Sequence, residues 1–539
     1  LIAPACGRKK DRDREKVRAT PGVAIEESEP RQGGHVKILS NEPRYLDPVL
    51  EPRLDAANSL IFEGLVGLDA RLEPVPRLAE KWSLSDDGKT LTFNLRACVL
   101  WHDGKPFTAK DVKFTYDAIR DPAHQSLWRS YLVSIDAVET PDDHTVIVRY
   151  KQPFAPAIVT WTFGIIPEHV YQGPDLAQSK GNTEPVGTGP FKLERWELGK
   201  RMFLRANEAW WLGRPYLDGI EVVVSPSAPV TELLRRGDLD FARVDDTGDW
   251  TNRAQMPDFR KDFEISDVVE ARFRALAWNT QRAPFDDKRV RTALTLGLDR
   301  GRVIDDVLMG QARSMSVPFS PTMYGTDPSI APLPFDPARA GALLDESGHK
   351  LVARGGSKDT DEDRTRFSVE IIAIDNQKNQ ITDATFGIFR NDLKAIGVEL
   401  RLTYLPGAEY FARIRKRDFD GAYFGFLPDI PDPDPYALLH SGESSSQNFS
   451  GYANPAVDKL LEEARGTTSR DQRKTLYMQV HKIVADELPY TLLYSPYGHY
   501  AWTHKLHGVS PRDLGANPIF PGVARWWLAQ PTMVAKPAP

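Results

Sequence analysis

The hydrophobic residues of this chain follow two different spacings, and both recur along its length. Apolar and polar residues alternate at 91–96, 367–374 and 398–404, which is typical of half-buried strands. Apolar residues spaced three or four apart, at 381–396 and 476–483, indicate amphipathic helices. Strand, helix and strand follow one another in the second half, so we expect a partly parallel sheet covered by helices.

Capping residues predict where two of the helices begin. Thr108 is followed three residues later by Asp111, which is an N-cap signature ahead of an apolar helical stripe. Ser469 and Gln472 have the spacing of a capping box before the helix of 476–483. A short strand at 490–494 should follow that helix.

Residues 422–435 join an aromatic strand to an acidic loop. The strand must end near Pro428, because proline cannot donate to a sheet ladder. Gly425 has no side chain, so another backbone can approach it closely. Three acids follow, namely Asp429, Asp432 and Asp434. This stretch fits a seat for a cationic group beside an apolar wall, and also fits a core strand followed by a solvated turn.

Length and composition indicate a multi-domain globular protein. At 539 residues the chain should form two or three domains, and 41% hydrophobic and 27% charged residues are ordinary values. The net charge of −6 gives no basic footprint, so we expect no nucleic-acid partner. The longest apolar stretch, 153–167, contains three prolines, so we expect no transmembrane helix.

Only two cysteines are present, Cys6 and Cys98, which excludes a disulfide framework or a cysteine metal site. We expect Cys98 to be a buried core residue and a bridge between the two to be disfavoured by a mobile tail between them. Cys6 follows small and apolar residues, as in a lipoprotein signal, and is either a lipidation site or an accidental cysteine. Residues 7–34 are highly charged and predict a flexible tether.

Residues that suggest catalysis are better explained as turns. His102 and Asp103 are sequence neighbours without a suitably spaced third partner, so a turn before a capped helix is favoured. Residues 185–191 contain two glycines but lack a phosphate-loop pattern, and the flanking prolines fit a rigid turn. A secreted hydrolase is disfavoured because GxSxG, HExxH and a Cys–His pairing are missing. The acids after Pro428 lack the Gly and Glu of an EF-hand loop.

Read together, the segments resemble the extracellular solute-binding proteins of bacterial ABC importers, in the oligopeptide/dipeptide-binding family known as family 5. The matching segments follow one order along nearly the whole body: 46–48, 63–65, 78–82, 101–114, 185–191, 211–218, 290–293 and 448–455.

The resemblance implies an α/β, two-lobed periplasmic-binding-protein-like fold (type II), with an extra subdomain in lobe I and a two-strand hinge. The strands near Trp278 and Tyr494 would cross between the lobes. The implied domains are 1–33 as a lipoprotein signal remnant and tether, 34–280 as lobe I with an inserted subdomain at about 61–184, 281–497 as lobe II, 498–530 as a return to lobe I, and 531–539 as a disordered tail.

The function implied is that of a substrate-binding component of an ABC importer, which captures peptides or peptide-like ligands in a cleft between the lobes. The protein would not be an enzyme and would need no cofactor or metal. Its partner would be an ABC permease in the cytoplasmic membrane. We expect a monomer in the periplasm or cell envelope, anchored by lipid on Cys6. The alternative is the same fold binding a metal chelate, haem, a sugar or an opine-like ligand.

The resemblance also implies ligand contacts. The ligand main chain would add beside a strand, and a carboxylate just beyond that strand would receive the ligand ammonium. Asp429 matches that carboxylate. The strand matches three residues: Gly425, Phe426 and Leu427.

The contacts of the opposite end of the ligand are less defined. Relatives often place a cation in the loop after strand 367–374, and Lys378 is the one cation of residues 375–380. Lys378 is therefore the candidate for a ligand carboxylate, with a solvated lysine as the alternative. At the end of strand 273–280, Trp278 and Asn279 are the remaining candidate contacts.

Overall fold

The computed structural model describes residues 29–51, 56–69, 73–173, 175–224, 227–270, 272–318, 324–353, 364–426, 434–443, 447–511 and 522–529. These residues form two compact α/β units. Unit 1 contains residues 29–152, 157–267 and 499–529, and unit 2 contains residues 153–156 and 268–498.

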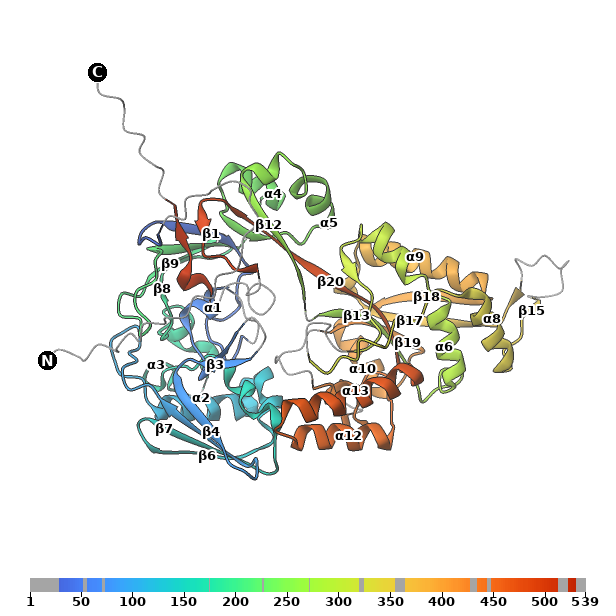
Figure 1. Cartoon of the computed structure of the whole chain (residues 1–539), viewed down its shortest axis with the longest axis horizontal. Coiled ribbons are helices and arrows are strands. Elements are labelled where there is room, and N and C mark those ends of the chain that lie inside the picture. The colour runs from blue at the N-terminus through green and yellow to red at the C-terminus, as the bar shows by residue number, and fades with distance from the viewer. Residues whose placement is uncertain are drawn as a thin grey trace, which may run out of the picture. The chain divides into compact units, whose positions relative to one another are not determined.

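Apart from the short segment 153–156, the chain changes unit within two strands, β12 (Phe263–Val269) and β20 (Tyr490–Thr503) (Figure 1). These positions, 267/268 and 498/499, lie close in sequence to the lobe limits predicted at 280 and 497. The residue limits of the lobes and the two-strand hinge stay predictions.

Unit 1 is built on a sheet in the order β11-β1-β10-β9-β8, with the end of β20 paired to β11. β1 runs parallel to β10 and β11, and β9 is antiparallel to both β10 and β8. The strands are β1 (His35–Leu39), β8 (Phe191–Glu197), β9 (Arg201–Ala206), β10 (Gly219–Val223) and β11 (Phe241–Arg243).

A second sheet of unit 1 has the order β4-β5-β7-β6 and carries α2 (Ala109–Arg120). Its strands are β4 (Ala79–Leu84), β5 (Thr90–Leu95), β6 (Ile135–Asp142) and β7 (Thr145–Tyr150). Alternate residues of β5 are buried, as the sequence predicts, and Phe93 contacts Trp161 at 5.7 Å between ring centroids. The main-chain N–H of Thr108 donates to Asp111 Oδ2 at 2.9 Å, which confirms the predicted helix start.

The smaller elements of unit 1 connect these sheets. They are α1 (Ala56–Ile61), β2 (Val66–Leu68), β3 (Pro74–Pro76), α3 (Glu168–Tyr171), α4 (Val230–Arg236), α5 (Thr247–Asp249), β21 (Leu506–His507) and β22 (Trp527–Leu528).

Unit 2 contains a sheet in the order β18-β17-β19-β13-β20. β17, β18 and β19 are parallel, and β13 runs antiparallel between β19 and the first part of β20. Its strands are β13 (Phe273–Trp278), β17 (Phe367–Ile374), β18 (Val398–Leu405) and β19 (Gly421–Phe426), and three short strands are β14 (Ala312–Arg313), β15 (Val352–Ala353) and β16 (Arg364–Thr365).

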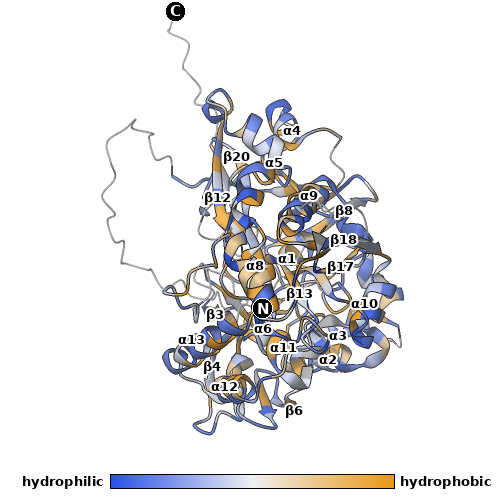
Figure 2. Ribbon diagram, turned by 90° about the vertical axis from the view of Figure 1, so that its right-hand side faces the viewer, coloured by the Kyte–Doolittle hydropathy of each residue, from blue (hydrophilic) through white to orange (hydrophobic). Residues whose placement is uncertain are grey.

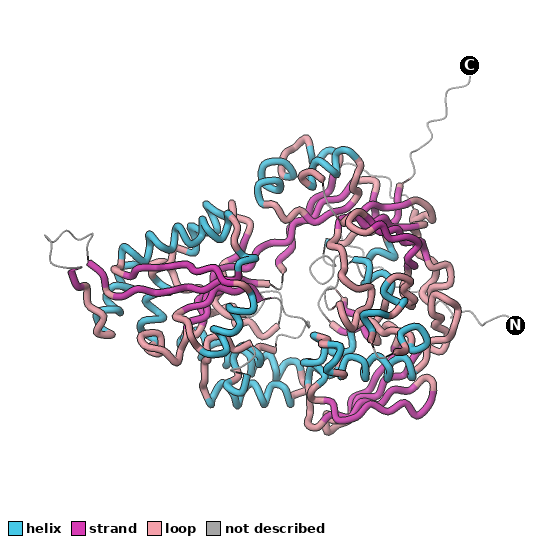
Figure 3. The backbone as a smooth tube through the Cα atoms, turned by 180° about the vertical axis from the view of Figure 1, so that it is seen from behind, coloured by secondary structure: helices cyan, strands magenta, loops and turns pink. Residues whose placement is uncertain are grey.

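Helices cover both faces of this sheet (Figure 3). Successive strand residues point to opposite faces, and both faces carry buried apolar side chains that pack against helices. Leu276 and Trp278 pack with α6 (Lys288–Leu296), α8 (Pro337–Glu346) and α9 (Gln380–Ala395). Ala275 and Ala277 pack with α10 (Gly407–Lys416), α12 (Pro455–Gly466) and α13 (Arg470–Glu487). The helices are banded in hydrophobic and hydrophilic residues, as their spacing predicts (Figure 2). Two short helices are α7 (Arg300–Arg302) and α11 (Tyr436–Leu439).

Strand β20 is longer than the five residues predicted for it. It extends from Tyr490 to Thr503 and passes through Pro496 and Gly498, which look like strand breakers in the sequence. The ladder continues because Pro496 lies opposite Ala312 of β14 and the N–H of Tyr497 donates to the carbonyl of Gln311 at 3.2 Å.

Two further expectations are wrong. Ser469 is the N-cap of α13, but its side chain makes no capping hydrogen bond, so the predicted capping box is not formed. Cys98 is half-buried in the turn after β5 and is disulfide-bonded, so it is not the core thiol that the sequence suggested. Cys6, the only other cysteine, lies outside the described residues.

Candidate functional site

The parallel strands of unit 2 end at one edge of the sheet. Ile374 of β17 lies opposite Leu405 of β18, and Phe426 is the last residue of β19. Phe273, at the start of the antiparallel β13, lies opposite Phe426 and so reaches the same edge. We call this the carboxyl edge. In open α/β sheets, ligands bind beyond the carboxyl ends of the strands.

The main chain of Gly425 is open at the carboxyl edge. The N–H of Asn279 donates to the carbonyl of Asp420, so hydrogen-bonded pairs between β13 and β19 fall on the even-numbered residues of β19. The N–H and C=O of Gly425 therefore point away from β13. On that other side, β17 pairs with β19 only at Gly421 and Ala422. Among the described residues, no strand takes up the main-chain groups of Gly425.

Arg274 lies over the face of Gly425. The two residues are opposite one another in a pair that makes no ladder hydrogen bonds, the kind in which side chains approach most closely. A Cβ built on Gly425 would lie 2.9 Å from Arg274 Cζ and 3.4 Å from its Cδ. The guanidinium carbon is 5.9 Å from the ring centroid of Tyr423, on the same face.

Phe426 forms an apolar wall on the opposite face of β19. Its ring centroid lies 5.3 Å from that of Phe273, and it packs against the buried cluster that includes Phe424. Gly425 and Phe426 are thus together at the carboxyl edge. Leu427 and Asp429, the other two residues predicted beside them, lie outside the described residues.

Lys378 also lies at the carboxyl edge, in the connection between β17 and α9. It is exposed and follows a 3-10 turn, and its Nζ is 5.8 Å from the ring centroid of Tyr404. The hydroxyl of Tyr404 donates to Asp383 Oδ1 at 2.7 Å, and desolvation together with this acid raises the pKa of Tyr404. No ion pair of Lys378 occurs within the described ranges.

Trp278 and Asn279 lie at the other end of β13. Trp278 is opposite Gly421, and the four residues from Gly421 to Gly425 span ~13 Å of strand. The Trp278 side chain is fully buried, stacks on Phe285 at 5.8 Å and donates from Nε1 to Thr491 Oγ1 at 2.8 Å. Its contacts are those of a core residue, and its role in ligand binding stays a prediction.

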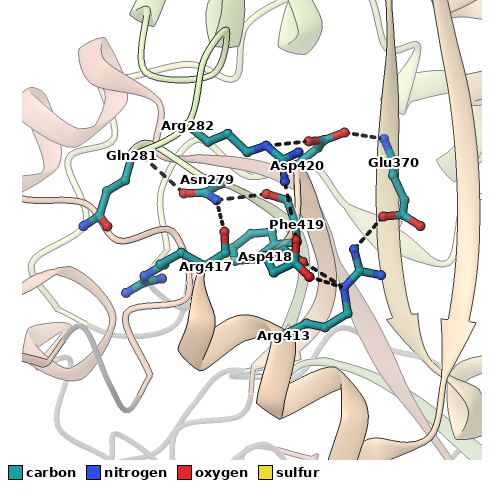
Figure 4. A network of polar contacts seen from close by, with 9 residues as sticks. All are labelled: Asn279, Gln281, Arg282, Glu370, Arg413, Arg417, Asp418, Phe419 and Asp420. Carbon is teal, nitrogen blue, oxygen red and sulfur yellow. Dashed lines mark hydrogen bonds and ion pairs between the residues drawn. The ribbon is translucent and has the colours of Figure 1, made fainter.

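Asn279 belongs to a polar network that holds the start of β19 (Figure 4). Its Nδ2 donates to the carbonyls of Arg417 and Phe419, both at 2.9 Å, and its Oδ1 accepts from the N–H of Gln281 at 3.2 Å. The side chain is buried and every polar atom of it is used. A ligand contact by Asn279 also stays a prediction.

Ion pairs extend the same network to β17. Arg413 Nη2 lies 2.7 Å from Glu370 Oε2, and the N–H of Glu370 donates to Asp420 Oδ2 at 2.9 Å. Arg282 Nε lies 3.4 Å from Asp420 Oδ1. This end of the sheet, the amino edge of β19, is therefore closed by contacts within the protein (Figure 4).

Asp434, the last acid of the loop, has a structural role. Its Oδ1 accepts from the N–H of Tyr436, the first residue of α11, at 3.0 Å, and its Oδ2 lies 2.6 Å from Arg465 Nε. Because both oxygens are used, Asp434 is not a vacant ligand for a cation. Asp429 and Asp432 are outside the described residues, and the residues that are described contain no cluster of three or more metal-ligating side chains.

His102, set aside as a turn residue, ties two loops of unit 1. Its Nε2 lies 3.0 Å from the carbonyl of Gly189, and its Nδ1 accepts from the N–H of Gly187 at 3.2 Å. Burial lowers the pKa of His102 to about 3, so the ring is neutral. A neutral ring bonded on both nitrogens supports the turn interpretation and leaves no nitrogen for a metal.

Sequence reasoning missed two groups. Arg274 carries a charge within an otherwise apolar strand, and that interruption was the available signal. Glu63 of unit 1 is buried and accepts from Trp211 Nε1 at 2.9 Å and Trp210 Nε1 at 3.3 Å. Burial raises the pKa of Glu63 to about 7. Its surroundings come from distant parts of the chain, so nothing in the local sequence predicts them.

Within the described ranges, no helix is both long and apolar enough to cross a bilayer. The family model of bacterial extracellular solute-binding proteins, family 5 (middle part), matches residues 73–448. The chain belongs to this family. Membership confirms the resemblance and the α/β fold class expected from the sequence, and it places the chain among binding proteins rather than enzymes.

Individual relatives match over nearly the whole chain. The oligopeptide-binding protein AppA of Bacillus subtilis is 28% identical over 523 residues, covering 93% of each chain. Protein XP55 of Streptomyces lividans is 32% identical over 507 residues, covering 90% of this chain and 88% of that protein. The solved structure of Bacillus subtilis AppA, in complex with a nonapeptide, matches with a TM-score of 0.75 and 26% identity, covering 93% of this chain and all of that one, 100%.

Proposed function

We propose that this protein is the substrate-binding component of an ABC importer and captures peptides or peptide-like ligands. Family membership and the relative that is named for oligopeptide binding support this function. The observation that carries it is the open main chain of Gly425 at the carboxyl edge of unit 2. The predicted closure of two lobes over the ligand stays part of the proposal.

Main-chain pairing explains how such a site would accept many sequences. A ligand strand added beside β19 would bond to the N–H and C=O of Gly425, which every peptide can do regardless of its side chains. Phe426 offers an apolar surface on the other face of the strand. β17 cannot occupy this position, because its pairing with β19 stops at Ala422.

The ligand ammonium is assigned to Asp429, on the resemblance and on its place three residues beyond Phe426. A desolvated ammonium needs a carboxylate, and a hydrogen bond between charged groups contributes ~1.5–3 kcal/mol. Leu427 would line the same strand end. Both residues lie outside the described part of the chain, so these roles rest on the sequence.

Titration calorimetry with a peptide library tests the proposal. We expect heat from a subset of peptides, and Asp429→Ala should weaken their binding while Asp305→Asn, a change at an exposed acid elsewhere in unit 2, should not. Native mass spectrometry of the freshly purified protein would identify any ligand it carries. If no peptide binds and the carried ligand is a metal chelate, haem or a sugar, the peptide assignment is wrong.

The partner of a loaded binding protein of this class would be an ABC permease in the cytoplasmic membrane, with the binding protein acting as a monomer. Crosslinking in membranes that hold the permease would test the partnership. Extracellular location follows from the family, and attachment to the membrane by lipid on Cys6 is the finer proposal.

A further inference from the structure

Arg274 is a cation at the carboxyl edge, and no acid among the described residues pairs with it. None of the ion pairs or hydrogen bonds of the described residues involves its guanidinium. The side chain is nevertheless half-buried and held in place, over Gly425 on one side and within 5.9 Å of the Tyr423 ring centroid. A guanidinium carries five N–H donors, so this arrangement leaves donors of Arg274 without an acceptor among the described residues.

We infer that Arg274 binds a carboxylate of the ligand and determines specificity for ligands that carry one. This inference rests on the proposed function, because it places the carboxylate on a ligand whose main chain lies beside Gly425. The planar guanidinium forms two parallel hydrogen bonds with a carboxylate, which fixes orientation as well as charge. The guanidinium carbon lies over the Tyr423 ring, 5.9 Å from its centroid, which is within the range of a cation–π contact.

Lys378 competes for the same assignment, and the structure separates the two residues. Lys378 is exposed on the connection after β17, whereas Arg274 is half-buried on β13. Two strand spacings, ~10 Å, separate β17 from β13, and Lys378 lies a further four residues beyond the end of β17. A charge that is partly shielded from water attracts a carboxylate more strongly than a solvated one.

Among the described residues, the other charged groups named at this edge lie on the β17–α9 side. Asp383 accepts from the Tyr404 hydroxyl, and Lys378 lies over the same ring. Asp375 is exposed in the turn before Lys378. Tyr494, opposite Arg274 on β20, has its pKa raised by burial, so it is a neutral neighbour. Of the described cations, Arg274 is the one that lies against the Cβ position of Gly425.

Arg274 also gives a reason for glycine at position 425. The guanidinium occupies the space that a side chain there would fill. Glycine at position 425 therefore leaves room for the Arg274 side chain and also allows a ligand backbone to approach.

Trialanine and its C-terminal amide provide the test, with binding measured by calorimetry. Wild-type protein should bind the free acid about 10- to 100-fold more tightly than the amide, the range expected for a charge-assisted pair. Arg274→Gln should remove that preference. Arg274→Lys, which keeps the charge but loses the fork, should give an intermediate preference. Arg390→Gln, which removes an exposed charge from α9, should keep the wild-type preference.

A second peptide pair locates the carboxylate on the ligand. If the wild type binds the free acid and the amide equally, the amides of Ala-Asp-Ala and Ala-Asn-Ala are compared to test recognition of an acidic side chain. The wild type should then prefer the Asp peptide, and Arg274→Gln should lose that preference. A preference that persists in Arg274→Gln and disappears in Lys378→Gln overturns the inference. So does a wild type that shows no preference in either pair.

If no peptide binds, the proposed function fails separately from the inference. The same variants are then heated with acetate, succinate or chloride at equal ionic strength. Extra stabilisation of the wild type by the carboxylates, lost in Arg274→Gln, supports the inference. Equal melting temperatures in all three salts overturn it.

Discussion

The two ends of the β13–β19 pair use polar groups in opposite ways. At the amino edge of β19, Asn279 bonds through every polar atom to the chain around it, and Asp420 and Arg282 extend the network. At the carboxyl edge, the main chain of Gly425 and the guanidinium of Arg274 have no such partners among the described residues. The same two strands therefore carry a closed end and an open end, ~13 Å apart.

The difference shows what each kind of polar residue contributes. A buried polar group whose bonds are all internal contributes to stability, and its loss is felt whether or not a ligand is present. A polar group left open destabilises the free protein and is compensated by a ligand. Substitutions at the amino edge should therefore change unfolding, and substitutions at the carboxyl edge should change affinity.

The largest effect should come from Asn279→Ala. The change leaves the carbonyls of Arg417 and Phe419 buried without their donor, at ~1–3 kcal/mol each, so the free energy of unfolding should fall by ~4 kcal/mol. Thermal unfolding followed by circular dichroism measures the loss, with the exposed Asn376→Ala as the control. A ligand affinity that drops while the melting temperature is unchanged would mean that Asn279 binds the ligand directly.

Glu63 of unit 1 is another buried polar group that is hydrogen-bonded within the protein, and its charge depends on pH. Burial raises its pKa from an ordinary value of 4.5 to about 7 in the folded protein, so the folded state binds the proton more tightly and loses stability as pH rises through this interval. The shift corresponds to roughly 3 kcal/mol over the whole interval. Melting temperature should fall from pH 5 to pH 8.

Asp47 adds to the same slope, since burial raises its pKa to about 7 as well. Glu63→Gln, which keeps the shape and removes the titration, should reduce the slope of melting temperature against pH without abolishing it. An unchanged slope in that variant would show that Glu63 ionises in the folded protein as it does in water.

The sequence predicted part of the fold, but it did not predict which end of the β13–β19 pair is open. Alternation gave β17 at its observed limits, because each of its residues faces a fixed side of one sheet. The sequence did not predict the full length of β20, because Pro496 looks like the end of a strand. The short strand β14, which pairs with β20 at Pro496, is distant in sequence. The open and closed ends could not be told apart, since Trp278 and Gly425 both look like residues of aromatic strands until the register is known.

Among the site candidates, Gly425, Phe426 and Lys378 lie at the carboxyl edge, and their roles in ligand binding stay predictions. The sequence did not single out Arg274, because its role depends on Gly425, which lies opposite it in the sheet. The two residues are 151 positions apart in the chain (425 minus 274). A side chain's partner across a sheet is a property of the register, which no single segment specifies.

At the carboxyl edge, Asp429→Ala should weaken ligand binding more than Gly425→Ala does. Removing the carboxylate from a ligand ammonium costs ~1.5–3 kcal/mol, which is about 10- to 100-fold in Kd. The melting temperature of the free protein should not fall. Calorimetry with a bound peptide and with the same peptide acetylated at its amino end checks the reason, since the acetylated peptide should lose affinity for the wild type and not for the variant.

The smallest effect, and the most specific one, should come from Gly425→Ala. The new Cβ would meet the Arg274 guanidinium, with Cζ at 2.9 Å, and because that is the far end of a long side chain the arginine should move rather than the sheet. We expect the free energy of unfolding to change by less than ~1 kcal/mol and binding of carboxylate ligands to weaken severalfold. Gly387→Ala on α9 is the matched control, because nothing lies within 4 Å of its Cβ position and alanine favours a helix by ~0.5–1 kcal/mol. If Gly425→Ala weakens free acid and amide peptides equally, the added methyl blocks the ligand backbone, and the glycine serves main-chain approach rather than the arginine.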